Sequence, residues 1–269
     1  MTLRRAVERL LPTALLALAI LVVWETYVRL SGVRPQVLPA PSRVIAEGWA
    51  FRDLIGAHLL PTLAETVVGF TLAIVAGTAA AVAIDWSQAA RRALYPMLVA
   101  SQAIPVVAVA PLLVLWFGFG LLPKALVVAL VTFFPITVGW VDGFAATERA
   151  AANLLRSMGA SRWQVFRLVR MPGALPSFFS GLRIAITYAV VGAIFAEYVG
   201  AKRGLGIFMQ LQQNAFRTDL VMAAVVVTAV ISVSLFLATY AVERTAIPWH
   251  AVSRNARGGS GAGGAGSRR

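Results

Sequence analysis

Long apolar runs separated by short polar segments dominate the pattern of this chain. Six of these runs approach the roughly 20 apolar residues that a membrane helix needs. They are residues 10–30, 62–84, 93–116, 121–141, 181–199 and 220–242. The pattern predicts an all-α polytopic membrane protein of about six transmembrane helices. An even number of spans places both termini on the same side of the membrane.

Prolines interrupt two of the predicted spans. Pro96, Pro105 and Pro111 fall in the third run and Pro135 falls in the fourth. Each proline removes a backbone donor where no water can replace it, so we expect these helices to kink. A kinked helix either bends to line or gate a pathway or is a static feature that neighbouring helices absorb.

The predicted spans and the segments between them divide the chain into an N-terminal helix, an outer loop, a core and a tail. In numbers, these are residues 1–31, 32–61, 62–249 and 250–269. The outer loop is proline-rich and predicts a surface helix from about Ser42. Residues 200–219 are expected to form an irregular loop or re-entrant segment at the outer mouth. The glycine-rich basic tail is expected to be disordered.

Composition agrees with a membrane protein. The chain has 269 residues, of which 59% are hydrophobic and 13% charged, with a net charge of +13. The charges gather between the apolar runs, which indicates anionic lipid and not nucleic acid as the partner. Placing both termini in the cytoplasm puts most of the arginines there, as the positive-inside rule requires. The first apolar run is too long for a cleaved signal peptide.

Few polar side chains fall inside the predicted spans. Glu65 and Glu197 lie close enough to the apolar centre that each should meet a partner, a water-filled cavity or a substrate. Side chains that could line a pathway, or equally serve packing, are Gln102, Trp116, Phe133, Phe134, Trp140 and Tyr188. The predicted substrate pathway comprises Gln102, Pro105, Phe133, Tyr188 and Glu197.

Catalytic motifs are missing from the sequence. The two histidines, His58 and His250, are far apart, and the chain has no cysteine. These facts disfavour a metal cluster, a Ser/His pair and an intramembrane enzyme. The sequence has no Walker-type phosphate loop, so we expect no cofactor on this chain. The energy for transport must come from a partner or from an ion gradient.

The segment 142–180 is the longest basic stretch between two spans. Trp163, Phe166 and Val169 recur at helical spacing, which predicts a short amphipathic helix at the membrane face. Gly159 can form a turn before it. Pro172 and Pro176 are expected to end the helix and return the chain to the bilayer. Such a segment is either an interfacial loop or a docking surface for a cytoplasmic partner.

The same segment carries a specific resemblance. It reads NLLRSMGASRWQVFRLVRMPGALPSFFSGLR from Asn153, and FAEYVGAKRGLG follows later in the chain. This pattern resembles the signature loop of binding-protein-dependent ABC importer permeases, which have the type I importer fold. Within that family the sequence is most similar to the nitrate, sulfonate and taurine group, especially its branch linked to the pyrimidine precursor of thiamine. The family's usual Glu-Ala-Ala is replaced here by Asn153, Leu154 and Leu155.

The resemblance implies a permease subunit of the bacterial inner membrane and not an enzyme. Two copies, expected to form a homodimer, would make the pathway, two cytoplasmic ATPase subunits would bind ATP and Mg²⁺, and an external solute-binding protein would deliver the solute. The residues implied in ATPase coupling are Asn153, Arg156, Gly159, Ala160, Ser161, Trp163 and Phe166. The solute would be a thiamine pyrimidine precursor, a sulfonate, taurine, nitrate or a similar molecule. The alternative is a secondary transporter driven by an ion gradient, with Glu197 as its ion site.

Overall fold

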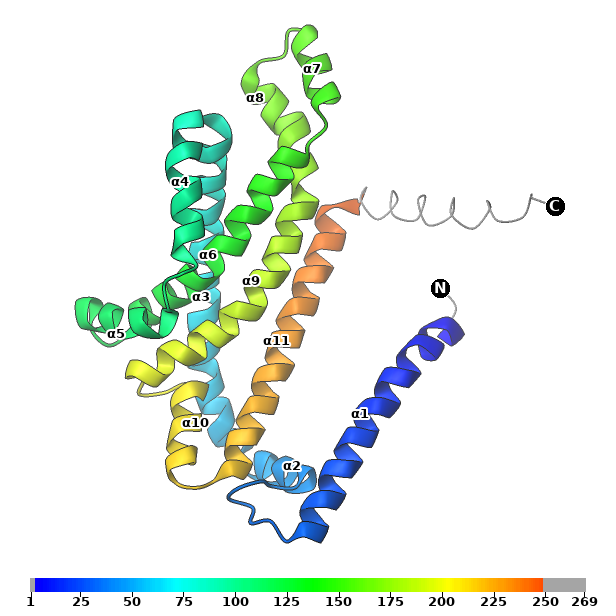
Figure 1. The fold of residues 1–269 in the computed structure, drawn as a ribbon, viewed down its shortest axis with the longest axis vertical. Helices are drawn as coiled ribbons and strands as arrows, with labels where there is room; N and C mark the ends of the chain where they lie inside the picture. Colours follow the sequence, from blue (N-terminus) through cyan, green and yellow to red (C-terminus); the bar gives the residue numbers. More distant parts are fainter. Residues whose placement is uncertain (1–2, 249–269) are drawn as a thin grey trace, which may run out of the picture. The chain divides into compact units, whose positions relative to one another are not determined.

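The computed structural model describes residues 3–248, and the predicted tail lies outside these residues. In the described part the secondary structure is helical throughout (Figure 1). The elements are α1 (Leu3–Ser31), α2 (Pro41–Ala50), α3 (Arg52–Trp86), α4 (Gln88–Ser101), α5 (Val106–Phe117), α6 (Leu121–Ala146), α7 (Arg149–Ser157), α8 (Arg162–Val165), the π-helical turn η1 (Phe166–Arg170), α9 (Met171–Gly200), α10 (Leu205–Asn214) and α11 (Thr218–Ala246).

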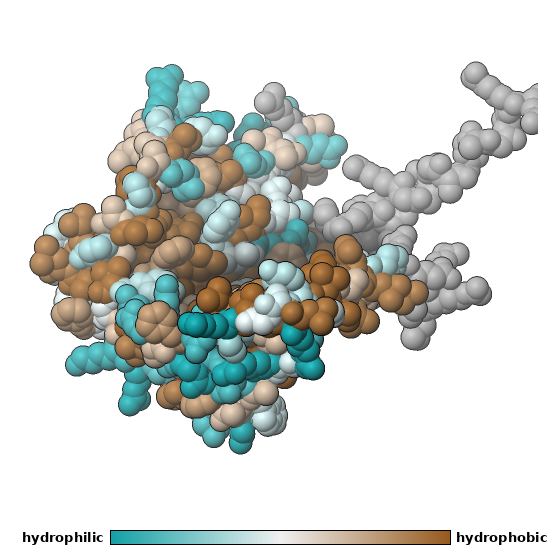
Figure 2. All heavy atoms as spheres, turned by 60° about the horizontal axis from the view of Figure 1, so that its bottom comes forward, coloured by the Kyte–Doolittle hydropathy of each residue, from teal (hydrophilic) through white to brown (hydrophobic). Residues whose placement is uncertain are grey.

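Five described helices are long and apolar enough to cross a membrane, and α4 with α5 forms one further bent pair. This count agrees with the prediction of about six spans. Large apolar side chains are exposed along these helices, and Figure 2 shows apolar surface over much of one face. Because lipid is as apolar as these side chains, their exposure is what a membrane-embedded surface requires.

The third predicted span is broken rather than kinked. Helices α4 and α5 meet at an angle of 103°. At the end of α4 the amide groups of Gln102, Ala103 and Ile104 bond three residues back, so the helix tightens before it ends. Pro105 then follows as the N-cap of α5 with an extended backbone. Proline disfavours helical conformation at the residue before it and lacks its own donor, which explains why the break falls here.

Two further expectations are wrong. Pro172 and Pro176 do not end a helix, because a helix runs without interruption from Arg162 to Gly200. The π-helical turn η1 ends at Arg170, directly before α9 begins. Pro172 falls in the first turn of α9, where a missing backbone donor is tolerated. The second error concerns residues 200–219, where the regular helix α10 replaces the expected irregular loop, while the alternative of a re-entrant segment stays a prediction.

The described chain divides into two compact units. One comprises Met1–Pro61 and Lys202–Ala229, and the other comprises Thr62–Ala201 with the rest of α11. Ion pairs link distant parts of the first unit: Arg43 bonds Asp219 at 3.0 Å, and Arg217 bonds Glu47 at 2.8 Å. These contacts connect α2 with the start of α11. The outer loop and the segment after α10 are therefore joined within the same compact unit.

The core of the second unit lies where α6 packs along α9, and these two helices run side by side in Figure 1. Their backbones approach closely at glycines. A Cβ on Gly143 would lie 2.6 Å from the Ala174 carbonyl oxygen, and one on Gly181 would lie 2.3 Å from that of Pro135. Only glycine allows such an approach, as is usual between membrane helices. The helices are thereby held in one register.

Candidate functional site

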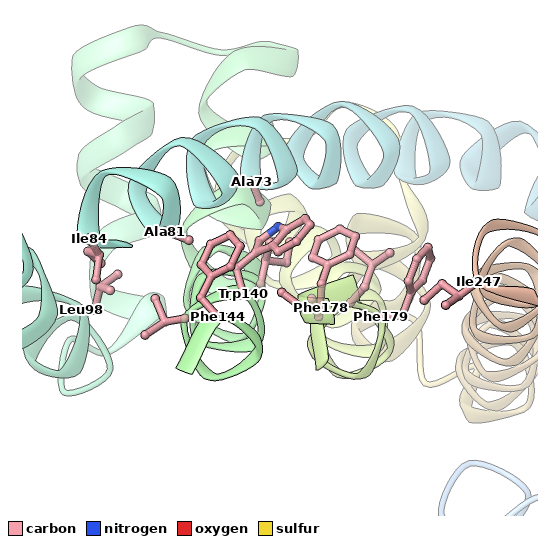
Figure 3. Packing of buried hydrophobic residues seen from close by; sticks show 14 of the residues in the cluster. Ala73, Ala81, Ile84, Leu98, Trp140, Phe144, Phe178, Phe179 and Ile247 are labelled. Atoms are coloured by element: carbon pink, nitrogen blue, oxygen red, sulfur yellow. The ribbon is translucent and has the colours of Figure 1, made fainter. Parts of the chain in front are cut away.

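Aromatic rings form a continuous column through the core of the second unit. Successive ring centroids are 4.3 to 6.0 Å apart, within the range of favourable aromatic contact. The rings belong to Trp86, Trp163, Phe166, Phe144, Trp140, Phe178 and Phe179. Figure 3 shows Phe144, Trp140, Phe178 and Phe179 in a row beside α3. The column therefore runs from the α8 segment into the middle of the unit.

The end of the column lies at α7 and α8, which sit together at one end of the α6 and α9 pair (Figure 1). Gly159 has a backbone φ of +83°, a conformation that favours glycine. Its amide bonds the Arg156 carbonyl and that of Ala160 bonds the Leu155 carbonyl, which together form a Schellman motif. The turn between α7 and α8 is thus fixed by backbone hydrogen bonds.

Ser161 begins α8 with a capping box. Its hydroxyl accepts from the Gln164 amide at 3.3 Å, and its own amide donates to the Gln164 side chain at 2.7 Å. Both bonds satisfy donors that a helix start otherwise leaves free. Only the four residues from Met158 to Ser161 separate α7 from α8, so the two helices form one preorganised surface. We refer to residues 149–166 as the docking segment.

Two polar contacts tie the docking segment and the η1 turn that follows it to α3. The Arg162 guanidinium donates to the Trp86 carbonyl at 2.8 Å and lies over the Trp86 ring. At the end of η1, Arg170 pairs with Asp85 at 2.7 Å, and the Asp85 side chain is largely buried. A displacement of the docking segment must therefore move the end of α3 or break these contacts.

The exposed face of the docking segment is apolar at its centre and basic around it. Leu154, Met158 and Trp163 are exposed large hydrophobic residues. Asn153, Arg156 and Ser161 are exposed too, whereas Ala160 is half-buried. Phe166 is different, because it is buried in the aromatic column. Of the predicted coupling residues, Phe166 therefore anchors the segment, and the others lie on or near its surface.

Leu154 and Met158 are the surface residues that the sequence reasoning did not include among the coupling residues. Their exposure follows from the strongly amphipathic pattern of α7, in which these two positions are four residues apart and share one face. That spacing was readable from the sequence.

A cavity of about 650 Å³ opens between the end of α4 and the helices α6 and α9. Its volume is in the range of pockets that hold small organic molecules. Its polar and aromatic lining residues are Gln102, Phe134, Asp142, Ser177, Ser180 and Tyr188. Gly139 and Gly181, where α6 and α9 are in close contact, line it as well. Two rings of the aromatic column, Trp140 and Phe178, follow the lining residues Gly139 and Ser177 directly in the sequence.

The cavity contains some of the predicted pathway residues. Gln102 and Tyr188 line it. Pro105 forms the break before α5, and Phe133 packs against the hydrophobic core, so neither belongs to the lining. Asp142, Ser177 and Ser180 were not predicted to line a pathway. Their position at the cavity depends on the contact of α6 with α9, which a single sequence does not reveal.

Glu197 lies in a separate buried cluster. Its carboxylate accepts a hydrogen bond of 2.5 Å from the Thr62 hydroxyl. Nearby, Glu65 forms a buried ion pair of 2.6 Å with Lys124. The expectation of a partner for each glutamate is confirmed, and the partner of Glu65 is Lys124, which is buried in the first turn of α6. A buried charge needs such a partner, because desolvation is costly.

The fold and the cavity define a polytopic α-helical permease subunit. The family model described as "Binding-protein-dependent transport system inner membrane component" matches residues 69–247. The chain belongs to this family, whose members are ABC importer permeases, and it is a multi-pass protein of the bacterial inner membrane. It is a transport subunit rather than an enzyme. Membership in this family decides against the alternative of a secondary transporter driven by an ion gradient.

Individual relatives agree with this assignment. The formylaminopyrimidine transport permease protein ThiX of Halalkalibacterium halodurans is 39% identical over 91% of this chain and 98% of its own. The riboflavin transport system permease protein RibX of Chloroflexus aurantiacus is 38% identical over 90% of each chain. Among solved structures, the inward-facing MetNI methionine ABC transporter matches with a TM-score of 0.58 at 19% identity, over 73% of this chain and 96% of its own. That likeness concerns the fold.

Proposed function

We propose that this chain forms the translocation pathway of an ATP-driven importer and receives the motion of a cytoplasmic ATPase subunit on its docking segment. The ATPase binds ATP and Mg²⁺, and this chain binds neither. Two copies of the chain form the pathway, and an external solute-binding protein delivers the solute. Both termini then lie in the cytoplasm, on the side of the docking segment.

The observation that carries the proposal is the construction of the docking segment. It presents an exposed apolar centre of Leu154, Met158 and Trp163 on a turn that is fixed by its own backbone. Apolar residues surrounded by arginines are typical of an interface centre with a polar rim. The segment is joined to the solute cavity through the aromatic column and through the continuous helix that runs into α9.

The solute proposed for this pathway is a small organic molecule. The names of the relatives suggest a formylaminopyrimidine, riboflavin, taurine or an aliphatic sulfonate, and the resemblance seen in the sequence adds nitrate. In such importers the binding protein contributes to the choice of solute.

The test is to charge the centre of the docking segment. Met158, which is 74% exposed, is replaced by glutamate, and Val37, which is 71% exposed in a turn of the other unit, receives the same change as the control. Met158→Glu should lose the co-purifying ATPase subunit and solute uptake, because a charge in an interface centre must be desolvated. Val37→Glu should retain both. If Met158→Glu purifies with the ATPase and transports at the normal rate, the docking proposal is wrong.

A second variant tests the turn itself. Gly159→Pro cannot adopt the φ of +83°, since proline is fixed near −65°. It should abolish both uptake and solute-stimulated ATP hydrolysis while the permease remains in the membrane. Normal transport by this variant would contradict a role of the turn in coupling.

A further inference from the structure

The lining of the cavity between α6 and α9 contains an acidic side chain and no basic one. Among its lining residues the one acidic side chain is that of Asp142, and none is a lysine, arginine or histidine. Within the described residues no salt bridge involves Asp142, whereas the carboxylates of Asp85, Asp219, Glu25, Glu47, Glu65 and Glu243 are all paired. A solute in the cavity therefore meets one unneutralised negative charge.

An arginine that contacts the lining does not change this balance. Arg183 reaches the lining residue Ser180, donating a hydrogen bond of 3.0 Å to its hydroxyl. However, Arg183 also forms an ion pair with Glu243 of α11, which neutralises its charge. The Ser180 hydroxyl in turn donates to the Pro176 carbonyl, so it is already engaged. Among the described residues that line the cavity there is therefore no cation to face the solute.

The remaining lining favours flat molecules with hydrogen-bonding groups. Phe134 and Tyr188 provide aromatic faces, which stack well on planar rings and attract cations. The Gln102 amide and the Ser177 hydroxyl provide donors and acceptors for ring substituents. A sulfonate or nitrate, by contrast, requires arginine, lysine or a set of backbone donors, and the lining offers no such cation.

We propose that this cavity selects solutes by charge, admitting neutral or cationic planar heteroaromatic molecules and excluding sulfonates, with Asp142 as the residue that determines this specificity. The proposal rests on the proposed function and narrows the solutes considered there. A second copy of the chain facing the same pathway adds another Asp142 and no cation from these lining positions. The pairing of two subunits therefore strengthens the discrimination.

The experiment measures direct binding by the purified permease in detergent, so that the external binding protein does not decide the result. Three probes share one ring and differ in charge: nicotinamide is neutral, 1-methylnicotinamide is a cation and pyridine-3-sulfonate is an anion. Wild type should bind the cation and the neutral probe at least about tenfold more tightly than the anion, a difference that corresponds to about 1.4 kcal/mol. Failure of wild type to bind any probe, or equal binding of all three, overturns the proposal.

Variants then assign the effect to one residue. Asp142→Asn should weaken binding of the cation and strengthen binding of the anion, each by about tenfold, and change the neutral probe by less than about threefold. Asp53→Asn is the matched control, because the Asp53 side chain is 92% exposed and lies far along the sequence from the cavity residues. An unchanged ratio of cation to anion binding in Asp142→Asn overturns the role of Asp142.

The docking and charge proposals can fail separately. Loss of the ATPase from the wild-type complex would count against the proposed function but would leave the probe affinities unaffected. Conversely, an Asp142→Asn permease that retains its ATPase and shows no change in charge preference would refute the specificity proposal alone.

Discussion

The close contact of α6 and α9 at Gly181 can be tested by adding a single methyl group. In Gly181→Ala the new Cβ would lie 2.3 Å from the Pro135 carbonyl oxygen and 3.2 Å from the Gly139 Cα. Real Cβ atoms keep at least 3.0 Å from such neighbours, so the helices must separate by about 0.7 Å. The obstructing atoms are backbone, which cannot rotate away. Overpacking of this kind costs about 1–3 kcal/mol.

Gly192→Ala on the same helix is the matched control. A Cβ there would meet the Val128 Cα at 3.6 Å, an ordinary contact. Both substitutions stabilise the helix by about 1 kcal/mol, because alanine has a higher helix propensity than glycine. That gain cancels when the two variants are compared, so the difference between them reports the clash. We expect Gly181→Ala to be less stable than Gly192→Ala by about 1–3 kcal/mol.

The assay is thermal unfolding of both purified variants in the same detergent. In a chain of this size, each kcal/mol of lost stability is expected to lower the unfolding midpoint by about 2–4 °C. Gly181→Ala should also reduce uptake, because Gly181 lines the cavity. Unfolding midpoints that agree within about 1 °C would refute the packing argument, since they would mean that the helices accept a methyl group at Gly181 as easily as at Gly192.

Three further substitutions probe other contacts. Lys124→Met leaves the buried Glu65 carboxylate without its partner and should cost about 3–5 kcal/mol in thermal unfolding, whereas adding Glu65→Gln to it should restore most of the loss. Ser161→Ala removes the cap of α8 and should cost about 0.5–2 kcal/mol locally, seen as faster amide exchange at the start of that helix and unchanged exchange in α6. Asp85→Asn weakens the bond to Arg170 and should lower the free energy of unfolding by about 1.5–3 kcal/mol, and an unchanged midpoint would show that the pair contributes nothing.

The apolar pattern was sufficient to predict the helical class and the approximate number of spans, because lipid demands long uninterrupted apolar helices. The turn at Gly159 was predicted from the conformational freedom of glycine, and the backbone φ of +83° confirms it. The prolines were harder to interpret. Pro105 ends a helix and Pro135 does not, although both lie within apolar runs. The outcome depends on whether neighbouring elements satisfy the freed carbonyl groups, and this is a tertiary property.

The pairing of charges could not be predicted for a similar reason. Glu65 was expected to have a partner, but Lys124 is 59 residues away in the sequence, and a single sequence does not show that α3 and α6 bring the two together. The cavity lining depends likewise on the register of α6 against α9, which the glycine contacts at Gly139 and Gly181 determine. A single sequence lists these glycines among 22 without indicating which of them touch.

The uninterrupted helix from Arg162 to Gly200 connects the docking segment with residues that line the cavity. At a rise of 1.5 Å per residue, Trp163 and Tyr188 are separated by roughly 37 Å along its axis. A tilt of about 5° at the docking end therefore moves the far end by about 3 Å, a distance comparable to the diameter of a water molecule. A partner that shifts the docking segment only slightly would thus change the width of the cavity by enough to admit or expel a layer of water around the solute.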